Sequence, residues 1–185
     1  MVRIRRIAIA ELRHDVTTMS AHPEGGPAHR AQLTEEIAVR TGIDEAMIET
    51  LVRTFYGRVQ TDPLLGPIFA ERITDWEPHI ARIRAFWSSV ALMTGRYHGQ
   101  PLQLHMELPV DAAHFDRWLD LFEATARELC PPTAAAHFIE RARRIADSLE
   151  LGINTGRGVL PTGPGAGRRR AAPDAAPLRD SPLPG

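Results

Sequence analysis

Residues 75–93, DWEPHIARIRAFWSSVALM, decide the fold class of this chain. Asp75 can accept hydrogen bonds from the free amides of a first helical turn, and Pro78 is tolerated in such a turn. Apolar side chains then recur every three or four residues, which is the spacing of one helix face: Trp76, Ile80, Ile83, Phe86, Trp87 and Val90. The stretch predicts a long helix with an aromatic face.

The same spacing extends in both directions along the chain. Upstream, Asp44 is a predicted N-cap for a helix whose apolar face carries Phe55 and Tyr56, and Thr34 is predicted to begin a shorter helix. Downstream, Asp111 begins a predicted helix with Phe115 and Trp118, and Thr133 is the predicted cap of a last one through Leu149. Alternating strand patterns are absent, so the predicted class is all-α.

The aromatic residues mark where the core lies, because all 11 fall between Phe55 and Phe138. Residues 44–151 are therefore predicted to form the folded domain. Residues 1–43 are predicted to be a partly flexible N-terminal extension, in which residues 20–30 are a linker. Residues 152–185 are rich in Gly, Pro and Arg and lack aromatic residues, which predicts a disordered tail.

Composition excludes several classes of protein. Residues 44–151 hold 11 Arg and 16 acidic side chains, a net charge of −5, which argues against a nucleic-acid-binding face. A single cysteine, Cys130, rules out an intrachain disulfide framework and favours a reducing cytoplasm. No apolar run approaches the roughly 20 residues of a membrane span, so no membrane association is expected. The chain has no lysine, which excludes Schiff-base chemistry.

The polar side chains on the aromatic faces leave more than one interpretation open. Glu-x-x-His, His-Glu-x-x-His and Gly-x-Ser-x-Gly motifs are all absent. Tyr56, His79, His105 and Trp118 remain, and each taken alone is compatible with ordinary packing or solvent exposure. A planar apolar cofactor such as haem, ligated by a histidine, would use the aromatic surface. An aromatic-rich helical interaction module is the alternative.

Six short motifs, in order and at these separations, resemble the group III (P-type) truncated haemoglobins: FYGRV, DPLLGPIF, W-x-x-H, FW, GQPLQLH and HFDRWLDLF. The resemblance covers residues 44–151. It implies a truncated globin fold, a two-over-two helical sandwich around haem b (iron protoporphyrin IX). In that family's pattern His105 matches the proximal ligand of the haem iron, and Phe69 matches the phenylalanine that packs against the porphyrin.

The resemblance also implies the residues of the ligand pocket. Tyr56 matches the distal tyrosine, His79 the histidine near the ligand entrance, and Trp118 the tryptophan whose indole N–H lines the distal pocket. Five more positions match the pocket wall: Phe55, Ile83, Phe86, Trp87 and Phe115.

A five-coordinate iron with hydrogen-bond donors on its open side would bind oxygen, nitric oxide or carbon monoxide. Strong donors imply slow release, and so favour ligand sequestration or redox detoxification over oxygen transport. The resemblance leaves an enzyme open as well, either a peroxidase-like catalyst acting on peroxide or a nitric oxide dioxygenase. The sequence has no flavin or nicotinamide motif, so a dioxygenase would take electrons from a partner reductase.

Overall fold

The computed structural model describes residues 26–158, which form seven α-helices and no strand. The predicted all-α class is confirmed. The predictions for residues 1–25 and 159–185, most of the extension and the tail, lie outside the described residues. The helices are α1 (Pro27–Thr41), α2 (Glu45–Thr61), α3 (Gly66–Arg72), α4 (Trp76–Leu92), α5 (Pro101–His105), α6 (Ala112–Leu129) and α7 (Pro132–Gly156).

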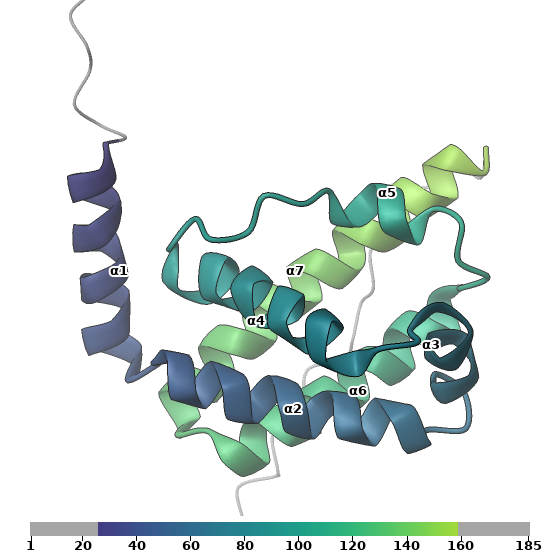
Figure 1. Cartoon of the computed structure of the whole chain (residues 1–185), viewed down its shortest axis with the longest axis horizontal. Helices are drawn as coiled ribbons and strands as arrows, with labels where there is room; N and C mark the ends of the chain where they lie inside the picture. Colours follow the sequence, from purple (N-terminus) through teal and green to yellow (C-terminus); the bar gives the residue numbers. More distant parts are fainter. Residues whose placement is uncertain (1–25, 159–185) are drawn as a thin grey trace, which may run out of the picture.

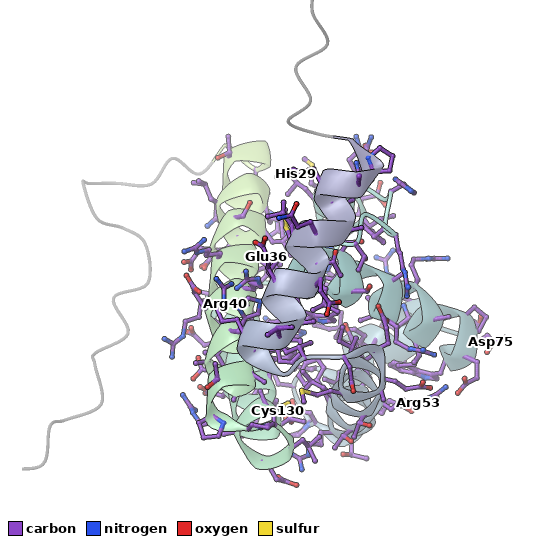
Figure 2. All side chains as sticks on the ribbon, turned by 90° about the vertical axis from the view of Figure 1, so that its left-hand side faces the viewer. His29, Glu36, Arg40, Arg53, Asp75 and Cys130 are labelled. Atoms are coloured by element: carbon purple, nitrogen blue, oxygen red, sulfur yellow. The ribbon has the colours of Figure 1, made fainter. Side chains whose placement is uncertain are left out.

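Four of the helices form two pairs that pack on one another. α2 packs on α4, α6 packs on α7, and across the pairs α2 contacts α6 and α4 contacts α7 (Figure 1). This is the two-over-two arrangement that the resemblance to the truncated haemoglobins implies, and the structure confirms it. α1 lies against α4 and α7, and Figure 2, viewed from that side, shows Arg40 between α1 and α7.

Acidic N-caps start three of the long helices as predicted. The Asp44 carboxylate accepts a hydrogen bond from the Met47 amide at 2.7 Å, and that of Asp75 accepts one from the Glu77 amide at 3.2 Å. Asp111 accepts from the amides of Ala113 and His114 and forms a capping box with the His114 ring. These carboxylates accept hydrogen bonds from amides that have no partner inside the helix, and their negative charge interacts favourably with the positive end of the helix dipole.

Three predicted boundaries are wrong. α1 begins at Pro27 rather than at Thr34, so it takes in part of the predicted linker, and α7 begins at Pro132 without the predicted Thr133 cap. Proline is well suited to the first helical position, where its missing N–H costs no hydrogen bond. α7 also continues to Gly156, so residues 152–156 are helical rather than part of a disordered tail.

An aromatic stack fills the centre of the sandwich. The ring of Phe122 on α6 lies between two tryptophans and is nearly parallel to both. Its centroid is 4.7 Å from that of Trp87 on α4 and 5.2 Å from that of Trp118. Phe122 and Trp87 are at most 2% exposed, whereas Trp118 is half-buried. The stack therefore ties the core to a side chain near the surface.

A buried carboxylate holds the turn between α2 and α3. Asp62 accepts hydrogen bonds from the amides of Leu64 and Leu65, both at 3.0 Å, and from Arg117 Nε at 2.7 Å. Burial opposes its ionisation, but the hydrogen bonds from Leu65, Arg117 and Leu64 outweigh this and lower the pKa of Asp62. The turn fixed in this way carries α3, and with it Phe69, over α2.

Candidate functional site

Tyr56 lies at the centre of an aromatic cluster contributed by three helices. It is buried on α2, and its ring centroid is 5.8 Å from that of Phe69 on α3. From α4, Trp76 and His79 approach the Tyr56 ring at 6.1 and 5.4 Å. The structure therefore brings together three residues predicted for the site, Tyr56, Phe69 and His79.

The Tyr56 hydroxyl makes no hydrogen bond with any described residue of the chain. Burial raises the pKa of Tyr56 well above its usual value, because an ionised phenolate would lose its hydration. The hydroxyl thus keeps its proton and can donate a hydrogen bond to a ligand.

His79 carries the second unpaired polar group of this cluster. Its Nε2 is buried and has no hydrogen-bond partner among residues 26–158. Desolvation lowers the pKa of His79, and the charge of Arg82 and the neighbouring His105 lower it further. A neutral imidazole is therefore favoured. A buried polar atom without a partner is uncommon in proteins, and it fits a place where a ligand completes the site.

His105 is half-buried as the last residue of α5. Its Nδ1 lies 2.7 Å from the carbonyl oxygen of Pro101 one turn earlier. An oxygen acceptor at that distance requires Nδ1 to carry the proton, which leaves the lone pair on Nε2. This is the tautomer of a metal-binding imidazole, and the carbonyl also fixes the plane of the ring.

Trp118 packs against Phe55, which also contacts Tyr56. Its ring is edge-on to Phe55, with centroids 5.3 Å apart, while Phe55 is also edge-on to Tyr56 at 4.9 Å. The structure thus places Trp118 beside the cluster without ring contact to Tyr56.

The predicted wall residues divide between the site and the core. Phe69, Ile83 and Phe86 are half-buried and present apolar surface, whereas Phe55 and Phe115 are buried. Trp87 is buried as well, and its ring contacts are with Phe86, Phe122 and Phe138.

Sequence reasoning missed Trp76 as a site residue. Trp76 stacks on Phe69 with ring centroids 6.3 Å apart and lies edge-on to His79 at 5.6 Å. The signal was present, since Trp76 precedes His79 by three residues and so shares its helix face.

The residues present fit a haem. His105, whose Nε2 lone pair is free, lies close enough to His79 to lower the pKa of that imidazole, and Tyr56 and Trp76 pack edge-on against His79. Within residues 26–158, no three His, Cys, Asp or Glu side chains come together to hold a metal ion, and no helix is long and apolar enough to cross a membrane.

Comparison with known proteins points to the same cofactor. The sequence model of the bacterial-like globins matches residues 40–149. The group 3 truncated haemoglobin ctb of Campylobacter jejuni is 34% identical over 113 residues, which cover 58% of this chain and 89% of that protein.

Two solved structures are similar in fold. The crystal structure of a group III truncated haemoglobin from Campylobacter jejuni matches with a TM-score of 0.55 and 35% identity, over 58% of this chain and 89% of that one. The haemoglobin of Chloroflexus aurantiacus, a thermophilic phototrophic bacterium, matches with a TM-score of 0.52 and 25% identity, over 61% and 95%. The chain described here therefore belongs to the bacterial-like globins as a group III truncated haemoglobin, a haem protein that binds diatomic ligands such as oxygen.

Proposed function

We propose that this globin retains a diatomic ligand tightly, for sequestration or redox detoxification, rather than releasing it quickly as oxygen transport requires. His105 would hold the haem iron through Nε2. Six side chains would line the haem: Phe55, Phe69, Ile83, Phe86, Trp87 and Phe115. A bound haem supplies an iron with one position open to a diatomic ligand. We take the haem to be of the b type, which needs no covalent link to the protein; the single cysteine cannot form the two thioether links of a c-type haem. A reducing cytoplasm suits the free thiol of Cys130.

The observation that carries the proposal is the unpaired nitrogen of His79 beside Tyr56. His79 Nε2 is buried and has no hydrogen-bond partner among residues 26–158, and the centroid of its ring lies 5.4 Å from that of the buried Tyr56, whose hydroxyl can donate. Trp118 offers an indole N–H from the neighbouring helix. A hydrogen bond to a charged acceptor is worth roughly 1.5–3 kcal/mol, so each donor would slow release of a polar ligand about 10- to 150-fold.

The Tyr56→Phe variant tests the proposal, because it removes the hydroxyl and keeps the ring packing. We expect oxygen to leave the ferrous protein about 10- to 150-fold faster than from the wild type. Stopped-flow mixing of the oxygenated protein with an oxygen scavenger measures the rate. Tyr97→Phe is the matched control, since Tyr97 packs on Phe86 and has no ring contact with Tyr56. Equal rates in Tyr56→Phe and wild type would contradict the proposal.

A second candidate, peroxide reduction, follows from the state of His79. A neutral imidazole with a buried, free nitrogen can accept a proton from peroxide and return it to the departing oxygen, a role worth about 10²–10⁴ in rate. His79→Leu should then lower peroxide-dependent oxidation of a phenolic reductant at least about 100-fold, whereas His98→Leu, at an exposed position, should not. If His79→Leu does not change the turnover of peroxide, peroxide reduction by this route is excluded and ligand retention stays as the one proposed function.

A nitric oxide dioxygenase would need a partner reductase. Adding a reductase together with nitric oxide, and measuring the consumption of nitric oxide, tests that activity.

A further inference from the structure

We infer that the last turn of α7 positions the proximal histidine. Gly152, Gly156 and Arg157, here called the α5 seat, contact the segment from Leu102 to Val110 on both sides of His105. The inference rests on the proposed role of His105 as the iron ligand. The seat lies beyond residues 40–149, the range that matches the family model.

α5 depends on α7 for its place in the fold. Among the described helices α5 packs against α7 and no other (Figure 1). With only five residues, α5 is too short to be stable alone, because an isolated helix of that length does not offset its nucleation cost. The position of His105 is therefore set by whatever holds α5 on α7.

Two glycines four residues apart on α7 receive the side chains of α5. A Cβ on Gly152 would overlap one methyl of Leu102 and lie 2.9 Å from the other and 3.3 Å from Cγ. A Cβ on Gly156 would lie 2.6 Å from the terminal methyl of Met106, which is flexible enough to move aside. Leu102 and Met106 share one face of α5. Of these two glycines, Gly152 is therefore the one at which a side chain is less tolerated.

Arg157 holds the chain that follows His105. Its guanidinium donates to the carbonyl oxygen of Val110 at 2.9 Å and to that of Leu108 at 2.6 Å. The Leu108 amide in turn donates to the His105 carbonyl at 3.1 Å. Charge-assisted bonds of this kind are stronger than neutral ones. The seat therefore fixes α5 through its apolar face and through the backbone just beyond it.

The Gly152→Ala variant tests whether Gly152 is needed for the contact with α5 or is only one more residue of α7. Alanine has the higher helix propensity, so without a seat the substitution should stabilise α7 and change nothing at α5. If Gly152 does hold α5 in place, the new methyl group displaces Leu102 and loosens the segment of α5 that carries His105. Gly57→Ala on α2 is the matched control, because a Cβ there meets nothing within 4 Å.

The experiment uses the full haem-loaded chain and two readouts. Hydrogen exchange followed by mass spectrometry reports on the amides of residues 102–108, and resonance Raman spectroscopy reports the iron–histidine stretch. We expect Gly152→Ala to exchange at least about tenfold faster in this segment, a loss of about 1.4 kcal/mol, with a shifted stretch. Gly57→Ala should match wild type. Adding Leu102→Ala to Gly152→Ala should recover part of the slow exchange, since it removes the overlap but also the packing of Leu102 on α7.

Arg157→Gln provides a second, independent test at an exposed helix end, where misfolding is not expected. It should also speed exchange of this segment, and Arg144→Gln, a control whose side chain is 77% exposed, should not. If both Gly152→Ala and Arg157→Gln have the hydrogen-exchange rates and the iron–histidine stretch of the wild type, the inference about the α5 seat is wrong. The proposed function would not be affected by that result. If His105→Ala has the wild-type stretch, the proposed function fails instead, and the exchange rates still decide the seat.

Discussion

Replacing His105 by Ala is expected to abolish the native coordination of the haem iron. Removing only a hydrogen-bond partner of a metal ligand costs about 10–100-fold in affinity, so removing the ligand itself should cost more. The purified variant should contain little haem and lack the iron–histidine stretch. Haem content from the pyridine haemochrome spectrum, the Soret band and resonance Raman spectra measure the loss.

Two controls separate ligation from folding. Imidazole added to the His105→Ala protein should restore coordination, because it can occupy the space left by the side chain. His98→Ala, an exposed histidine on the loop before α5, should leave the spectra unchanged. Wild-type iron coordination in His105→Ala without added imidazole would show that another residue, such as His79, is the ligand.

Phe122→Ala is expected to destabilise the protein by about 3–5 kcal/mol, the usual cost of truncating a fully buried phenylalanine. Phe122 is 0% exposed and stacks on both Trp87 and Trp118, so the deletion leaves a cavity between two large rings. Urea unfolding monitored by circular dichroism measures the free energy of unfolding. Because the stack supports Trp118, the variant should also release oxygen faster than wild type.

The control for this change is another apolar truncation outside the core. Leu151→Ala on α7 removes a side chain that is 53% exposed and should cost at most about 0.5 kcal/mol. Phe122→Leu should fall between the two, since leucine fills part of the cavity. A loss below about 1 kcal/mol in Phe122→Ala would mean that the core closes around the gap, contrary to the packing described here.

Local chemistry explains which parts of the fold could be predicted. Asp44, Asp75 and Asp111 cap their helices through bonds to amides two or three residues away, so nearby sequence is enough to place them. The prediction for the start of α7 is wrong because it took Thr133 as the N-cap. Pro132 already suits the first helical position, so the helix begins one residue earlier. The prediction for the end of α7 is wrong because Gly152 and Gly156 have low helix propensity. In the structure both glycines lie against residues of the α5 segment, which is far away in sequence.

The site was less accessible to pattern reasoning than the fold. Nothing local distinguishes His105 from a solvent-facing histidine, and the resemblance to a family selected it. The unpaired state of His79 Nε2 and its place beside Tyr56 depend on how α2, α3 and α4 meet, which periodicity does not give. Arg157 was predicted to lie in a disordered tail. In the structure its guanidinium donates hydrogen bonds to the carbonyl oxygens of Leu108 and Val110, which follow His105 in the chain.

The dependence of α5 on α7 bears on how the protein matures on the ribosome. Arg157 follows His105 by 52 residues, so at about 5–20 residues per second the turn that secures the histidine emerges roughly 3–10 s after it. During that interval α2 and α4 can already pair, whereas the proximal side is open. Cofactor capture is then a late event in biogenesis, and a nascent chain stalled before Gly152 would carry a half-built pocket.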